Sequence, residues 1–429
     1  MSSPWRHPAT RTAIVAGAVL IAGLAREMVL ARAFGLSSEL DTFLVVASIP
    51  MAAIAVFSGT FQSAAVPVIT EVLQEPPQSG VGFHAVLRRY AAALAGLTIA
   101  WFGVTQLVPE TLAIFVFAPP GPVATVMLVV TVVFGAIVAA LSAYGLAVGL
   151  STTVTLAPAA VPLATAIVVL MTDQRTSVVL FGGLLIGNIS AAASLFGALR
   201  RAGAPISSLR MDGRFRRKLL RRGSILAPGT IVMAMTAPVD LYFAGVLITG
   251  AAAALNFGGK VPLALIGIGG VVISNVVFPA MSRRAVARDF DALRATARRW
   301  TVVSVVAGIA SATLVIMASD VLIAVLYAGG DMRAEALPSI SRVQQMFALS
   351  LPTFWMGLVW SRALIALDDT VTIAWIGLVA FVVNGVGNHI LSGALGVSGI
   401  ALATSVMYLV TTSIAGLRLR LVLGRRIAQ

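Results

Sequence analysis

Charged side chains inside long apolar stretches are the residues of this sequence that could do chemistry. Arg26, Asp240 and Lys260 each lie in a stretch that is otherwise almost entirely apolar. An ionisable residue inside a membrane span costs about 2.5–3.5 kcal/mol on insertion scales, so it usually faces a cavity and has a function. Guanidinium and ammonium groups bind phosphate oxygens. Arg26 and Lys260 are therefore candidates for a cavity that holds a phosphate or a pyrophosphate.

Each of these residues also has a purely structural interpretation. Arg26 could form an internal ion pair with its neighbour Glu27, or with Asp41 at the start of the next apolar stretch. Asp41 belongs either to the substrate cavity or to the cap of a helix. We expect Arg26, Asp41 and Lys260 to bind substrate, and the internal ion pair remains the alternative.

A second set of polar residues is predicted in the C-terminal half. Asn384 and Asn388 are four residues apart, which places them on one face of a helix. Together with Asp240 and Thr404 they offer carboxylate, amide and hydroxyl oxygens, which suit a hard monovalent cation such as sodium. Asp240 could instead carry a proton. The structural alternative is hydrogen bonding between helices by polar side chains.

Composition excludes several other classes of site. The 429 residues contain no cysteine and three histidines, so we expect no disulfide and no thiolate or histidine-rich metal centre. No Walker loop, HExxH motif or nucleophile elbow is present. We therefore expect no catalytic residues and no cofactor beyond a coupling sodium ion or proton. The net charge of +14 would suggest nucleic acid in a soluble protein, but here the basic residues lie in alternate loops.

Apolar residues, 59% of the chain, are organised in runs that are long enough to cross a membrane. The first run is long enough to be a retained span, and no cleavable signal peptide is expected. The pattern predicts an all-α integral membrane protein with about twelve transmembrane helices. Their expected bounds are 11–33, 41–70, 84–108, 121–146, 154–171, 178–199, 223–249, 254–281, 300–328, 340–366, 371–391 and 396–420.

Arginines predict how these helices are oriented. They gather before residue 12, at 88–89, at 200–222, at 283–299 and at 418–426, whereas the alternate loops hold little beyond Arg175, Arg333 and Arg342. Because basic loops stay in the cytoplasm, both termini are expected there. Apolar residues spaced three and four apart between 284 and 300, with arginines between them, predict an amphipathic helix on the membrane surface.

An internal repeat divides the chain into two halves. Pro50 and Pro67 are separated by the same interval as Pro262 and Pro279, in stretches of similar sequence. Since each half would hold six helices, the repeats would be parallel, as in transporters built from two lobes. We expect an N-terminal lobe at 1–200, a basic cytoplasmic linker at 201–222 and a C-terminal lobe at 223–429.

The block GLAREMVLARAFGLSSELDTFLVVASIP at 23–50 resembles the opening of the MviN/MurJ family of lipid II flippases, in the multidrug/oligosaccharidyl-lipid/polysaccharide (MOP) exporter superfamily. Further similar blocks follow in order: FQSAAVPVITE at 61–71, FAPPGP at 117–122, LAPAAVPL at 156–163, VVFPAMS at 276–282, LYAGG at 326–330 and RALIALDDT at 362–370. The resemblance implies a MOP-type transporter of the bacterial inner membrane. Its substrate would be undecaprenyl-pyrophosphate-linked peptidoglycan precursor, and cell-wall synthesis proteins would be its partners.

Residue by residue, the resemblance implies that Arg26, Asp41 and Lys260 contact the substrate. It also implies that Asp240, Asn384, Asn388 and Thr404 hold sodium, as in some members. The sequence departs from the family at Leu20, Ile54 and Ala55, where arginines are common. Members also commonly have fourteen helices, whereas twelve are predicted here. Another polyprenyl-linked saccharide, a cation-coupled multidrug exporter and a membrane scaffold whose basic loop 200–222 recruits a partner are therefore the alternatives.

Overall fold

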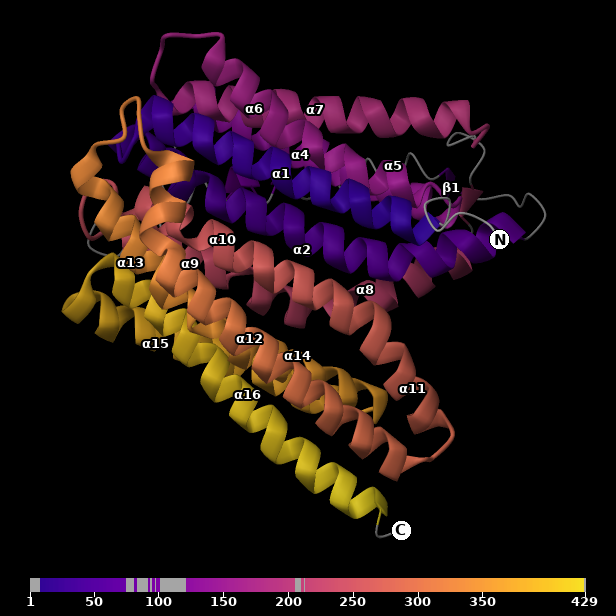
Figure 1. The fold of residues 1–429 in the computed structure, drawn as a ribbon. Coiled ribbons are helices and arrows are strands. Elements are labelled where there is room, and N and C mark those ends of the chain that lie inside the picture. Colours follow the sequence, from indigo (N-terminus) through magenta and orange to yellow (C-terminus); the bar gives the residue numbers. More distant parts are fainter. Residues whose placement is uncertain are drawn as a thin grey trace, which may run out of the picture. The chain divides into compact units, whose positions relative to one another are not determined.

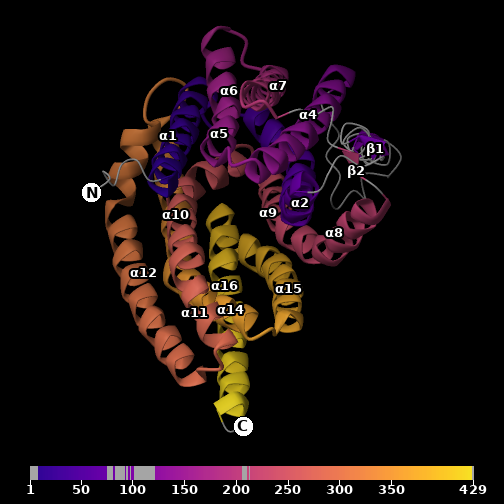
Figure 2. The same ribbon diagram turned by 90° about the vertical axis from the view of Figure 1, so that its right-hand side faces the viewer.

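The computed structural model describes residues 8–74, 81–82, 92, 95–96, 98–100, 121–204, 210–211 and 213–427. These residues form two compact units. Unit 1 comprises the chain up to Phe34 and Ser38–Pro238, and unit 2 comprises Gly35–Ser37 and the chain from Val239 onward. Figures 1 and 2 show that almost every described element is a helix.

Unit 1 is built from long apolar helices and one minimal strand pair. Its elements are α1 (Pro8–Phe34), α2 (Ser38–Gln74), β1 (Val81–Gly82), α4 (Pro122–Ala147), α5 (Ser151–Leu156), η3 (Ala157–Ala159), α6 (Ala160–Leu170), α7 (Ser177–Arg201), β2 (Arg210–Met211) and α8 (Gly213–Ala234). α4 packs against α2 and α7, and α6 packs against α1 and α7. The two strands pair antiparallel, with Val81 opposite Met211.

Unit 2 contains the helices that follow. They are most of α9 (Thr236–Gly245), α10 (Ala251–Val272), the π-helical turn η4 (Ile273–Val277), α11 (Phe278–Val286), α12 (Phe290–Tyr327), η5 (Ala334–Ala336), α13 (Leu337–Ala348), α14 (Ser350–Ala366), α15 (Thr370–Leu395) and α16 (Val397–Ile427). α14 packs against both α12 and α16, and α15 packs along α16. The core gathers apolar side chains of these helices, such as Leu351, Val359 and Leu364.

Ten helices in the described part of the chain are long and apolar enough to span a membrane. They match ten of the twelve predicted spans. Within the predicted span 223–249 the apolar helical stretch is shorter, Thr230–Gly245, and it is interrupted at Met235 between α8 and α9. The predicted span 84–108 lies outside the described residues, apart from 92, 95–96 and 98–100.

One expectation about segment boundaries differs from the structure. The segment 284–300 is not one amphipathic helix, because α11 ends at Val286 and α12 begins at Phe290. Arg288 between them adopts a positive φ of 55°, and Asp289 caps α12 by accepting from the backbone N–H of Ala292 at 3.0 Å. In the predicted linker 201–222, α7 ends at Arg201 and α8 begins at Gly213 and packs on α2; the role of this segment as a linker stays a prediction.

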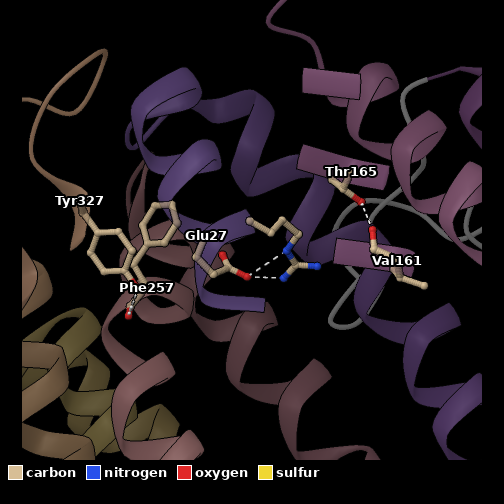
Figure 3. Close-up of polar contacts among 6 residues, drawn as sticks. Glu27, Val161, Thr165, Phe257 and Tyr327 are labelled. Atoms are coloured by element: carbon tan, nitrogen blue, oxygen red, sulfur yellow. Dashed lines mark hydrogen bonds and ion pairs between the residues drawn. The ribbon is translucent and has the colours of Figure 1, made fainter. Parts of the chain in front are cut away.

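Close packing of α6 on α7 depends on glycines that are one turn apart. A Cβ atom at Gly187 would lie 2.5 Å from the Cα of Val161, and one at Gly183 would lie 2.7 Å from the Cα of Thr165. The hydroxyl of Thr165 donates to the carbonyl of Val161 at 2.9 Å, so its polar group is satisfied inside α6 (Figure 3). Small residues let helix backbones approach in this way where no hydrophobic force drives association.

We expect Gly187→Ala to destabilise the protein by about 1–3 kcal/mol, the usual cost of overpacking. The added methyl group meets backbone, which cannot rotate away. Gly182→Ala is the matched control, because a Cβ there has nothing within 4 Å. Thermal unfolding in detergent measures the difference, and equal midpoints for the two variants would contradict this account of the interface.

Candidate functional site

A polar cluster in unit 2 joins three helices. Asn388 on α15 donates from Nδ2 to Oδ1 of Asp240 on α9 at 2.7 Å, and to Oδ1 of Asn384 at a longer 3.4 Å. Thr404 on α16 donates to the second carboxylate oxygen, Oδ2 of Asp240, at 3.4 Å. Asn384 and Asn388 are fully buried, and Thr404 is nearly so. The structure thus brings together the four residues that the sequence singled out as one set.

Local structure places Asp240 in this cluster. The chain leaves helical geometry at Met235 between α8 and α9, where the hydroxyl of Thr236 donates to the carbonyl of Met233 at 2.8 Å. The short helix α9 then presents Asp240 to α15. One turn along, the rings of Phe243 and His389 are 6.4 Å apart, so the same two helices are in contact beside the polar groups.

The hydrogen bonding of the cluster is incomplete. Oδ1 of Asn388 and Nδ2 of Asn384 are buried and have no partner among the described residues. Rotating an asparagine amide exchanges its oxygen and nitrogen, and such assignments come from hydrogen bonding. With the oxygen of Asn388 turned toward Asp240, a cation could replace the amide N–H that now lies between the oxygens. The donor set of carboxylate, amide and hydroxyl oxygens fits a hard cation such as sodium.

Arg26 in unit 1 forms an ion pair with its neighbour. Its Nη2 and Nε both contact Oε1 of Glu27, the Nε at 3.2 Å (Figure 3). The Glu27 side chain is 1% exposed, whereas the Arg26 side chain is 21% exposed. The alternative of an internal ion pair is therefore present, with Glu27 as the partner. Within the described part of the chain these contacts use Nε and Nη2, so the edge of the guanidinium that carries Nη1 stays available for an anion.

Asp41 is a buried residue in the first turn of α2. The helix begins at Ser38, so Asp41 is inside the helix rather than at its cap. A carboxylate in this turn interacts favourably with the positive end of the helix. Glu39, which the sequence did not indicate, instead contacts the start of a different helix. Its Oε2 accepts from the backbone N–H of Ser177, the first residue of α7, at 2.6 Å.

Lys260 in unit 2 is partly buried on α10, two residues before Pro262. The turn before it is fixed by packing on two other helices. Tyr327 of α12 donates its hydroxyl to the carbonyl of Phe257 at 3.2 Å, and the two rings are 4.9 Å apart (Figure 3). A Cβ at Gly258 would lie 2.6 Å from Val343 of α13. The backbone that presents Lys260 is thus held closely.

A second ion pair in unit 2 lies at the start of α15. Asp369 accepts from Nε of Arg418 on α16 at 2.6 Å and from the hydroxyl of Thr372 at 2.7 Å. The hydrogen bond from Arg418, more than any other contact, lowers the pKa of the Asp369 carboxyl below its ordinary value of 3.8. The pair therefore ties α15 to α16 at physiological pH.

Asp369→Asn should lower the thermal unfolding midpoint at pH 7. A depressed folded-state pKa stabilises the fold above the unfolded value and loses that stabilisation as pH falls through the folded value. The difference between wild type and variant should therefore shrink below about pH 4. Unfolding followed from pH 7 to pH 3 checks this. A difference that does not change with pH would show that the charge of Asp369 is irrelevant to stability.

A family model described as "Lipid II flippase MurJ" matches residues 30–425. The chain belongs to the MurJ lipid II flippase family. Its members are transporters rather than enzymes, and they span the membrane several times, as predicted. The resemblance that the sequence blocks indicated is thus confirmed for most of the chain.

Solved structures place this MurJ family member in the MOP superfamily fold. A structure of lipid II flippase MurJ in an inward closed conformation aligns with a TM-score of 0.75 and 19% identity, covering 95% of this chain and 87% of that chain. An inward-facing multidrug resistance MATE transporter gives 0.71 and 10% identity, covering 97% and 99%. A MOP superfamily transporter from Pyrococcus furiosus gives 0.66 and 10%, covering 97% and 95%.

At these identities the structural likeness shows the fold alone. It confirms the predicted all-α membrane architecture of MOP type. No curated protein matches the chain.

Proposed function

We propose that this protein flips a polyprenyl-pyrophosphate-linked saccharide, with lipid II as the preferred cargo, from the cytoplasmic to the outer leaflet of a bacterial inner membrane. The family match over residues 30–425 carries the proposal. Arg26 and Lys260 support it, because each half of the transporter contributes a cation from within a helix that is long and apolar enough to span a membrane. Two such cations suit a pyrophosphate better than a neutral drug.

In this mechanism the free edge of Arg26 would bind phosphate oxygens, since planar guanidinium groups recognise phosphate by parallel hydrogen bonds. Lys260 would add a point charge. Asp41 would accept hydrogen bonds from sugar hydroxyls. Alternating exposure of these groups to the two membrane faces would move the head group across, as in other transporters with two lobes.

A sodium ion would be held by Asp240, Asn384, Asn388 and Thr404. Bound there, the ion supplies positive charge that offsets the partly buried carboxylate. Because these residues lie on α9, α15 and α16, binding or release of the ion would change how the three helices are joined. Such differential binding is what a ligand needs to shift a conformational equilibrium.

The proposed orientation has both termini in the cytoplasm. The described ends of α7, α11 and α16 each carry two basic residues in their last turn, Arg200 and Arg201, Arg283 and Arg284, and Arg425 and Arg426. By the positive-inside rule, these basic residues support a cytoplasmic location for these helix ends.

Translocation of fluorescent lipid II by the purified protein in vesicles tests the proposal. Wild type should move lipid II at least several-fold faster than a polyprenyl-monophosphate saccharide. Lys260→Gln should slow lipid II roughly tenfold, the effect of about 1.4 kcal/mol, and Lys260→Arg should largely preserve the rate.

Lys218→Gln is the matched control for the loss of a lysine, because Lys218 pairs with Glu71 on α2. Equal rates for both saccharides would instead support a broader polyprenyl-saccharide cargo. No translocation of either would overturn the flippase assignment.

A further inference from the structure

The helix that carries Lys260 changes its winding between Ile273 and Val277. α10, the π-helical turn η4 and α11 form one continuous helical segment that ends at Val286. A π-helical turn holds more residues than an α-helical turn, is rare, and is often found at functional sites. Pro279 follows the turn and lacks the N–H that would bond to the carbonyl four residues back, which weakens α-helical pairing here.

Proline alone does not account for this winding. α2 carries Pro50 and Pro67 with the same spacing as Pro262 and Pro279, and it is α-helical throughout. At the π-helical turn, a side chain from a neighbouring helix makes contact as well: Arg362 of α14.

Arg362 contacts both ends of the π-helical turn. Its Nη2 donates to the hydroxyl of Ser274, the second residue of the turn, at 3.0 Å. Its guanidinium carbon lies 5.5 Å from the ring centroid of Phe278, the first residue after the turn. A guanidinium over an aromatic face is an attractive cation–π contact. One side chain therefore links the residues whose relative positions differ between π-helical and α-helical winding.

Two buried donors on the same face of α14 have no acceptor among the described residues. They are Nε of Arg362 and Nε1 of Trp355. The two residues are seven positions apart, which places them two turns apart on one side of the helix. Trp355 also lies against this segment, since a Cβ at Gly269 would come within 2.8 Å of its Cδ1. Buried donors without acceptors are costly, so a second arrangement of the segment against α14 could satisfy them.

We propose that the turn Ile273–Val277 is a hinge of the transport cycle, and that Arg362 is the positioning residue that holds it in its π-helical form. If the π-helical turn rewound as α-helix, the helix register across it would change by one residue. The helical parts on either side of the turn would then rotate by about 100° and shift by about 1.5 Å relative to each other. Lys260 would then turn relative to α11. The inference rests on the proposed function, because it gives the cargo-binding Lys260 its change of orientation.

The experiment uses the absence of cysteine from the chain, which lets spin labels be added without background. Labels at Ile268→Cys and Val286→Cys flank the turn, and both positions are exposed. Labels at Val303→Cys and Val321→Cys have the same sequence spacing on α12, which is α-helical throughout and serves as the control. Pulsed electron-spin resonance then gives the distance distribution for each pair, without cargo.

We expect Arg362→Gln and Ser274→Ala to change the ratio of two distance populations across the turn by roughly fivefold, the factor for one hydrogen bond of ordinary strength. Arg362→Lys should restore the wild-type ratio in part, because it keeps a charged donor. The α12 pair should not change. An unaltered ratio in Ser274→Ala, which loses only a hydroxyl, would overturn the proposal even if Arg362→Gln fails to fold.

The same samples test the hinge independently of whether lipid II is the cargo. The distances are measured without cargo, so a protein that fails to flip lipid II can still show the hinge. Adding lipid II should shift the wild-type ratio across the turn. A ratio that responds to the variants and not to lipid II would support the hinge and contradict lipid II as the ligand that moves it.

Discussion

Replacing Arg26 and Glu27 together by glutamine should give a folded protein that binds and flips lipid II much more weakly than the wild type. Arg26→Gln alone should lower the unfolding midpoint, because it removes one of the contacts of a carboxylate that is 1% exposed. Breaking a buried pair on one side typically costs about 3–5 kcal/mol, whereas replacing both partners by neutral groups is often tolerated. The double variant therefore separates the stabilising role of Arg26 from its proposed contact with pyrophosphate.

Loss of the guanidinium should weaken cargo binding roughly 10- to 100-fold, since hydrogen bonds to charged groups contribute about 1.5–3 kcal/mol. Thermal unfolding and vesicle translocation measure the two effects in parallel. Arg32→Gln, an exposed arginine of the same helix, is the control and should retain both properties. Full translocation by the double variant would show that the ion pair with Glu27 is the whole role of Arg26.

Sodium ions should raise the unfolding midpoint of the wild-type protein, and Asp240→Asn should abolish that effect. A ligand that binds only the folded state at 100 times its dissociation constant stabilises it by about 2.7 kcal/mol. The variant loses the one carboxylate of the cluster, while its amide can still accept from Asn388. Titration with sodium chloride against choline chloride isolates the response to the cation.

Asp320→Asn is the matched control, because Asp320 is a carboxylate in a helical span of unit 2 that accepts from Ser341. It should keep the sodium response, and Thr404→Val should weaken it in part. A sodium response that persists in Asp240→Asn would place the cation elsewhere. Stabilisation of the wild type by acid but not by sodium would favour a proton at Asp240.

Spans with clear polar ends could be predicted closely from the sequence. The expected span 178–199 is the helix Ser177–Arg201, because the apolar run ends at arginines. Breaks inside apolar runs could not be predicted. The expected span 223–249 is divided at Met235, where a hydroxyl bonds to a nearby carbonyl. The spacing of the apolar residues also predicted one helix across the end of α11 and the start of α12, because that spacing does not reveal the capping residue Asp289.

The parts of the candidate site that could be predicted are those whose residues lie close together in the sequence. Asn384 and Asn388 share a helical face by their spacing alone, and the structure buries both. The choice of Glu27 over Asp41 as the partner of Arg26 depends on side-chain conformation, which a sequence pattern does not specify. Arg362 could be recognised only as a buried charge, because its contact with the π-helical turn joins residues that are 88 positions apart.

The wide separation of the residues around Asp240 affects how the protein is made. Asn388 and Thr404 follow Asp240 by 148 and 164 positions in the chain. At about 5–20 residues per second, the ribosome needs roughly 8–30 s to supply them. During that interval the aspartate lies in a nascent apolar segment without these partners. Because an ionisable residue inside a span is costly to insert, stable integration of α9 should wait for the last two helices.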